Sequence, residues 1–247
     1  MNYNHIFSSS LLKIDSLKDF SFSRQDDSSY FLRRDLLSGN FYADFHLNVK
    51  EKTLEVHLFD RDSGEKYPLF DSPKSHGSFV SGLREEVQSI IDDFREKCFL
   101  TKDLREDFFS FVEKRFSALP EYPWKVESPK KEETSSSKKS GLKTDVYADY
   151  AVFRCPNKKW FALVGHVSYR QLGFSLENAD EKVWCVNLKA APEDIPSLID
   201  KKSIFPAFHM NKKHWITVIL TAVSDFDKIS SLTEKSYQLV MGKKKQS

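Results

Sequence analysis

The side chains best suited to binding a ligand lie in two short polar segments of the C-terminal half: Lys158, Lys159, His209, Asn211, Lys212, Lys213 and His214. Adjacent ammonium groups on projecting turns can reach two phosphates without reading a base sequence. Asn211 can donate to a phosphate or a base edge, and Arg154 and Arg170 would add charge nearby. A solvated surface turn also contains such lysines, and His209 and Asn211 can instead brace the turn, so the pattern alone leaves both interpretations open.

A metal site is disfavoured by the spacing of the two histidines. His209 and His214 are five residues apart around a turn that contains no Cys, Asp or Glu. Histidines four residues apart on a helix would share one face, whereas this spacing does not place two ligands together. We therefore expect no metal and no other cofactor.

Catalytic motifs are not recognisable in the chain. There is no Gly-x-Ser-x-Gly sequence, and the 8 glycines form no phosphate-binding loop. The acidic pairs Glu85-Glu86 and Asp92-Asp93 fall on the outer face of a predicted helix, where solvated carboxylates are expected. The sequence therefore predicts a binding protein and not an enzyme.

The charge is distributed unevenly along the 247 residues, although the net charge is only +2. Residues 1–124 carry 17 basic and 22 acidic side chains, a net charge of −5. The net charge is +3 for residues 125–144 and +4 for residues 145–247. A polyanion is therefore expected to meet the C-terminal half.

The hydropathy pattern and the cysteines point to a reduced, cytoplasmic protein. No apolar run approaches the ~18 residues that a spanning helix needs, and residues 1–7 lack the features of a secretory signal. Cys98, Cys155 and Cys185 are odd in number and far apart. We expect them to be reduced thiols, with Cys98 and Cys185 packed in the interior.

In the N-terminal half, alternating apolar residues over 41–59 predict a β-hairpin with its turn at residues 50–52. Apolar residues at steps of three and four then predict helices over about 79–98 and about 102–118. A weaker pattern near residues 8–18 suggests a leading helix. Residues 1–124 are thus predicted to form a small α+β domain.

Residues 125–145 contain a Ser-, Lys- and Glu-rich run without apolar side chains to bury, so we interpret them as a flexible insert. Beyond it, strands are predicted over 150–153, 160–167, 182–189 and 215–220. A helix is expected after Pro192 and another over about 226–240. The class is α+β, with an antiparallel sheet and packed helices in a domain of residues 146–247. We expect residues 145–247 to fold alone.

Four segments of this half, taken in order, resemble the MmcQ/YjbR family: Asp149–Arg154, Lys159–Val164, Val186–Lys189 and Phe205–Leu220. A looser match joins Gly77–Glu86 to the N-terminal extension of longer members. The chain departs from the family by adding polar residues after Pro123-Trp124. The resemblance implies a small bacterial α+β protein with a double-wing DNA-binding motif, whose wings are hairpin turns.

Carried over to this chain, the wings would present Lys158, Lys159, Lys212 and Lys213. The polar set beside them would be His209, Asn211 and His214, and Arg170 is a further candidate that would add charge. The predicted function is weak binding of double-stranded DNA through its phosphates, without a membrane. The alternative is a protein-interaction or small-ligand adaptor, in which the acidic N-terminal domain recognises a protein partner. Salt dependence separates the two, because phosphate contacts weaken steeply as salt increases.

Overall fold

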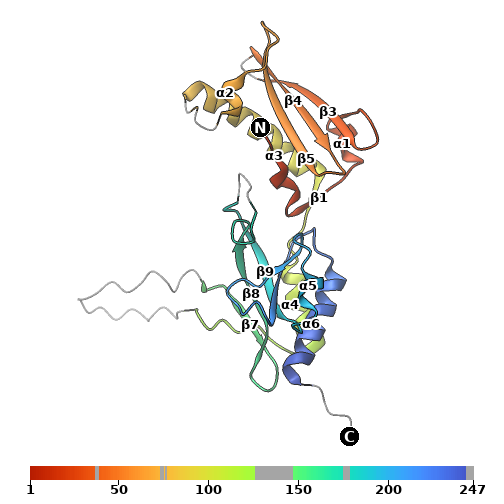
Figure 1. Ribbon diagram of the computed structural model, residues 1–247, viewed down its shortest axis with the longest axis vertical. Coiled ribbons are helices and arrows are strands. Elements are labelled where there is room, and N and C mark those ends of the chain that lie inside the picture. The colour runs from red at the N-terminus through yellow and green to blue at the C-terminus, as the bar shows by residue number, and fades with distance from the viewer. Residues whose placement is uncertain (37–38, 73–74, 76, 126–146, 175–178, 243–247) are drawn as a thin grey trace, which may run out of the picture. The chain divides into compact units, whose positions relative to one another are not determined.

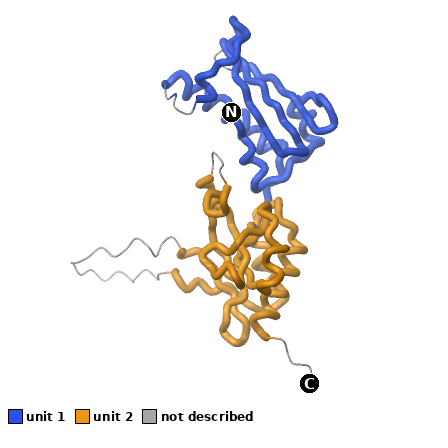
Figure 2. The backbone as a smooth tube through the Cα atoms, viewed as in Figure 1, with its two compact units in different colours: residues 1–102 blue, residues 103–247 orange. Residues whose placement is uncertain are grey.

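The computed structural model describes residues 1–36, 39–72, 75, 77–125, 147–174 and 179–242. The chain divides into two compact units, residues 1–102 and 103–247, which are coloured separately in Figure 2. Among the described residues, no helix combines the length and the apolar character needed to cross a membrane. Each unit has its own hydrophobic core.

Unit 1 combines short and long elements: η1 (Asn4–Phe7), β1 (Ser10–Leu12), α1 (Ser16–Asp19), β2 (Ser23–Arg24), β3 (Ser29–Asp35), β4 (Phe41–Asn48), β5 (Thr53–Asp60), α2 (Pro68–Asp71), α3 (Ser78–Cys98) and β6 (Phe99–Thr101). Strands β2-β3-β4-β5 form an antiparallel sheet in that order, and β1 pairs with β6. The alternation in β4 buries Ala43, Phe45 and Leu47 against the apolar face of α3.

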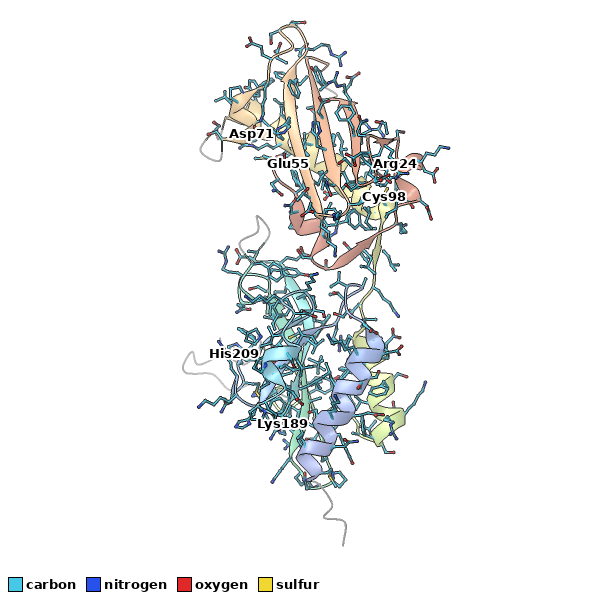
Figure 3. All side chains as sticks on the ribbon, turned by 45° about the vertical axis from the view of Figure 1, so that its right-hand side comes forward. Arg24, Glu55, Asp71, Cys98, Lys189 and His209 are labelled. Atoms are coloured by element: carbon cyan, nitrogen blue, oxygen red, sulfur yellow. The ribbon has the colours of Figure 1, made fainter. Side chains whose placement is uncertain are left out.

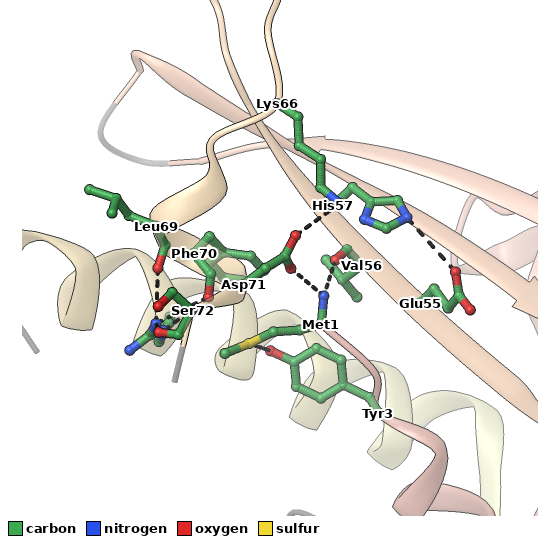
Figure 4. A network of polar contacts seen from close by, with 11 residues as sticks. Met1, Tyr3, Glu55, Val56, His57, Lys66, Leu69, Phe70, Asp71 and Ser72 are labelled. Atoms are coloured by element: carbon green, nitrogen blue, oxygen red, sulfur yellow. Dashed lines mark hydrogen bonds and ion pairs between the residues drawn. The ribbon is translucent and has the colours of Figure 1, made fainter. Parts of the chain in front are cut away.

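A network of polar contacts joins the first residue, β5 and α2 of unit 1 (Figure 4). The amino group of Met1 donates to the carbonyl of Val56 at 2.8 Å and to Asp71 Oδ1 at 2.5 Å. Lys66 Nζ lies 2.8 Å from the other carboxylate oxygen of Asp71. The two cations outweigh the effect of partial burial and lower the pKa of Asp71.

Unit 2 contains α4 (Arg105–Phe116), β7 (Ala151–Arg154), β8 (Trp160–Ser168), β9 (Lys182–Lys189), α5 (Ile195–Leu198), β10 (Ile204–Pro206), β11 (Trp215–Ile219) and α6 (Phe226–Met241). Its five strands form an antiparallel sheet in the order β10-β11-β9-β8-β7. Helices α4 and α6 cover one face of this sheet (Figure 1), where Phe116 stacks on Tyr237 with ring centroids 4.5 Å apart.

Several predicted elements are confirmed. The α+β class holds, and the predicted hairpin over 41–59 corresponds to β4 and β5, which pair from Phe41↔Asp60 to Asn48↔Thr53. The first long helix and the strand over 182–189 lie where the sequence places them. All three cysteines are buried and unpaired. The predicted flexible insert, apart from Lys125, falls outside the described residues.

The predicted domain boundary is wrong. The helix predicted over 102–118 belongs to unit 2, because Leu104, Phe108 and Val112 lie in the core beneath the C-terminal sheet. The first unit therefore ends near residue 102 and not at 124. The leading helix near 8–18 is also wrong, since Ser10–Leu12 pair as a strand with β6.

Candidate nucleic-acid interface

The two lysine-bearing turns leave the sheet of unit 2 at the same end. Strand β8 begins there at Trp160, β9 ends there at Lys189, and β11 begins there at Trp215, which pairs with Lys189. The β7–β8 turn and the β10–β11 connection are therefore neighbours, with β9 between them. At ordinary strand spacing their midlines are about 14 Å apart. We call this end, with both turns, the basic end.

The β7–β8 turn is a tight three-residue loop. Lys158 N–H donates to the carbonyl of Cys155 at 2.9 Å, and Cys155 N–H donates to the carbonyl of Lys159 at 2.9 Å. Lys158 has a φ of 66°, the left-handed conformation that ends such loops. Asn157 Nδ2 donates to the carbonyl of Val240 at 3.0 Å, which ties the turn to α6.

The β10–β11 connection is held by side-chain hydrogen bonds to the backbone. Asn211 Oδ1 accepts from Lys213 N–H at 2.9 Å, so this oxygen braces the turn. Phe208 N–H donates to Thr217 Oγ1 at 2.8 Å, and the Thr217 hydroxyl donates to the buried Asn187 Oδ1 at 2.6 Å. This buried relay explains why one polar residue interrupts the apolar strand β11.

The lysines of the basic end are available to a ligand. Lys158, Lys159, Lys212 and Lys213 are exposed, and none forms an ion pair with any described residue. Lys189 adds a further cation at the end of β9, where its Nζ lies 5.5 Å from the centroid of the Trp215 ring. The end therefore presents ammonium groups without matching carboxylates.

The two arginines do not extend this charge. Arg170 follows the opposite end of β8, about 27 Å away along nine residues of strand. It forms a two-point ion pair with Asp180 at 2.8 and 2.9 Å, which lowers the pKa of that carboxyl group. The prediction that Arg170 joins the site is therefore wrong. Arg154 lies beside the β7–β8 turn but pairs with Glu121 at 2.9 Å.

Among the described residues, Lys201-Lys202 is a third pair of adjacent lysines. It precedes β10 and lies at the sheet end opposite the basic end. Asp200 braces this turn. Although burial opposes ionisation, hydrogen bonds from the backbone N–H groups of Ile204, Lys202 and Ser203 dominate and lower the pKa of Asp200 to about 2.

In unit 2, a row of neighbouring aromatic rings extends from one basic turn to the other. Neighbouring rings in this row have centroids between 3.9 and 6.4 Å apart, and the order is Phe208, His209, Tyr147, Tyr150, Trp124 and Trp160. His209 is exposed and the other five are partly exposed. Figure 3 labels His209, a member of the row, and Lys189 in unit 2. We call this set the ring row.

Tyr150 anchors the centre of the ring row. Its hydroxyl donates to the carbonyl of His166 at 2.7 Å, and burial raises its pKa to about 12. The ring packs against Gly165, where a Cβ atom would lie 2.6 Å from Tyr150 Cδ2 and 2.7 Å from Cζ. A side chain at position 165 and the present position of Tyr150 are therefore incompatible.

Gly165→Ala is expected to destabilise the protein by about 1–3 kcal/mol, the usual cost of overpacking a well-filled site. The Tyr150 ring must move and lose its bond to His166. Tyr150→Ala in the same background should recover part of the loss, so the two changes should be non-additive in urea unfolding. Additive effects would show that the two residues do not compete for space.

The two cysteines of unit 2 are buried thiols. Burial raises the pKa of Cys185 to about 12 and that of Cys155 to about 11. Thiols with such pKa values are poor nucleophiles at neutral pH. Within the described residues, no group of three or more His, Cys, Asp or Glu side chains is arranged to hold a metal ion.

Comparison with known proteins places this unit in a family. The family model YjbR matches residues 136–239. The uncharacterized protein YyaQ of Bacillus subtilis (strain 168) is 30% identical over 136 residues, which are 55% of this chain and 96% of YyaQ. The chain belongs to the YjbR family. The resemblance seen in the sequence is thereby confirmed, and both basic turns lie inside the matched YjbR segment.

Among the solved structures similar to this YjbR protein are proteins of two bacteria. A crystal structure of a Pseudomonas syringae protein is 34% identical, with a TM-score of 0.42, and covers 55% of this chain and 97% of its own. A Deinococcus radiodurans protein, DR2400, described with a DUF419 domain, is 22% identical, with a TM-score of 0.36. It covers 56% of this chain and 78% of its own.

Proposed function

We propose that unit 2 binds double-stranded DNA through phosphate contacts made by the basic end. The observation that carries the proposal is the position of Lys158-Lys159 and Lys212-Lys213 at one end of one sheet. Their exposure and their lack of carboxylate partners among the described residues support it. Hydrogen bonds hold the backbone of both turns, so the lysine side chains start from fixed backbone positions.

The spacing of the turns suits a duplex. A separation of about 14 Å is close to the width of the major groove, about 12 Å, so the two turns can contact phosphates on either side of it. Phosphate contacts of this kind orient a protein on DNA and give little sequence preference. The lysine side chains are flexible, and Asn211 Oδ1 is already engaged by the turn. Both features favour weak and sequence-independent binding.

A salt titration of the full chain against a blunt DNA duplex tests this proposal. Four phosphate contacts predict that the logarithm of the association constant falls with the logarithm of salt concentration with a slope of about −3.6. The slope should be the same for duplexes of unrelated sequence. No measurable binding at low salt would overturn the proposal and favour the interaction-adaptor alternative.

A further inference from the structure

The ring row differs in exposure from the aromatic side chains at the centre of the unit 2 core. Phe108 of α4, Phe153 of β7 and Phe161 of β8 are fully buried in the core between the helices and the sheet. The ring row instead includes the exposed His209 and five rings that keep part of their surface in solvent. Its members come from segments before β7, from the first residue of β8 and from the β10–β11 connection, so the fold assembles it from distant parts of the sequence.

The ends of the ring row coincide with the basic turns. Trp160 directly follows Lys159, and the guanidinium of Arg154 lies 5.4 Å from its ring centroid. At the other end, His209 lies in the same connection as Lys212-Lys213. A ligand that follows the rings therefore passes from one pair of unpaired ammonium groups to the other.

Resting on the proposed function, we propose that the ring row binds the unpaired bases of single-stranded DNA next to a duplex. Partly exposed rings between basic groups are the features with which proteins bind single strands, because bases stack on the rings while cations contact the phosphates. A closed duplex keeps its bases stacked inside and can use only the lysines. The preferred ligand is then a duplex that carries a single-stranded overhang.

The ring of His209 is exposed, and its backbone has the left-handed conformation. It has a φ of 58°, and its ring lies against Phe208 with centroids 3.9 Å apart. The hydrogen bond from Phe208 N–H to Thr217 fixes the adjacent backbone. Tyr147 connects His209 to Tyr150 in the row: its ring centroid lies 6.3 Å from that of His209 and 5.0 Å from that of Tyr150. His209 and Tyr147 are thus the rings to test, because neither lies in a buried core cluster.

The first test needs no variant. Binding of the full chain is measured for a blunt duplex, for the same duplex with an oligothymidine overhang, and for the same overhang with abasic sites. All phosphates of the overhang are kept in the abasic ligand, so electrostatics are matched. We expect the overhang with bases to bind about tenfold tighter than the abasic one. Equal affinities would overturn the inference.

The second test uses His209→Asn with Tyr147→Leu. Asn tolerates the left-handed conformation, and Leu keeps apolar bulk while both rings are lost. The preference for bases over abasic sites, measured as the ratio of the two affinities, should disappear in this variant. Tyr42→Leu with His46→Asn removes the same ring types from unit 1 and should leave the preference intact. A preference that survives in the first double variant would also overturn the inference.

These outcomes are distinct from failure of the proposed function. In the unmodified chain, equal binding of the two overhangs together with intact binding to the blunt duplex would remove the inference and leave phosphate binding in place. Binding of the overhang that depends on bases, but with no binding of the blunt duplex, would remove the proposed duplex function and retain the ring row as a single-strand site. Thermal unfolding of each variant verifies that it is folded.

Discussion

A chain that begins at residue 145 is expected to lose cooperative unfolding, whereas a chain spanning residues 103–247 should retain it. The reason is helix α4 with its N-cap: Leu104 at the cap and Phe108 and Val112 in the helix are almost completely buried in the core of unit 2. Burying one such side chain contributes about 1.5–3 kcal/mol. Losing three removes about 5–9 kcal/mol from a domain whose total stability is of the order of 5–15 kcal/mol.

The edge of the sheet would be affected as well. Glu121 exchanges two backbone hydrogen bonds with Val152 of β7, at 3.0 and 2.8 Å, and these are lost with the same truncation. Urea unfolding followed by near-ultraviolet circular dichroism would measure the result for both fragments. A single transition for residues 145–247 with the midpoint of the longer fragment would contradict the expectation.

A point variant separates the effect of α4 from that of a shorter chain. In the full chain, Phe108→Ala should cost about 3–5 kcal/mol, as expected for a buried ring. Phe109→Ala, at the next and only partly buried position, should cost less. A loss of stability in the truncated chain and a separate loss in the Phe108→Ala variant would show that the core of unit 2 needs the helix that precedes the polar insert.

The sequence predicts the local elements of this fold well, because periodicity reports which face of an element is buried. Strict alternation over 41–59 and the run over 182–189 are strand signals that need no knowledge of the partner. Strand β10 was missed because three residues ending in Pro206 are too short to show any period. The sequence pattern does not predict strand β3, because the residues on both sides of the buried Leu32 mix apolar and polar side chains without regular alternation.

Assignments that depend on distant contacts are harder to predict. The apolar stripe of α4 shows that the helix packs, but Phe108 and Val112 carry no information about which sheet they meet. Arg170 shows the same limit within the site. Its charge made it a candidate, whereas Asp180, ten residues later, binds it at the other end of the sheet. The ring row joins Trp124 to Tyr147 and His209 only through the fold.

Replacing the four lysines of the basic end is expected to weaken binding to every duplex alike. The variant combines Lys158→Gly with alanine at Lys159, Lys212 and Lys213. Glycine is chosen at 158 because the φ of 66° suits it, so the turn should keep its shape. Each lost phosphate contact should make the salt slope shallower by about 0.9, and the full variant by about 3.6, which leaves a slope close to zero.

The third lysine pair supplies the matched control. Lys201 has a φ of 55°, so Lys201→Gly with Lys202→Ala removes the same two charges and repeats the backbone situation of Lys158-Lys159. If the fixed geometry of the basic end matters, this variant should leave the salt slope nearly unchanged. The double variant Lys158→Gly with Lys159→Ala should instead make it shallower by about two.

Equal losses from both double variants would mean that attraction follows net charge and not position. In that case the basic end would have no special role, although DNA would still be bound. The two explanations differ because a positioned contact releases counterions from particular phosphates, whereas net charge acts through a field that salt screens within about 10 Å at 0.1 M. Because the third lysine pair lies at the opposite end of the same sheet, it separates position from charge within one folded unit.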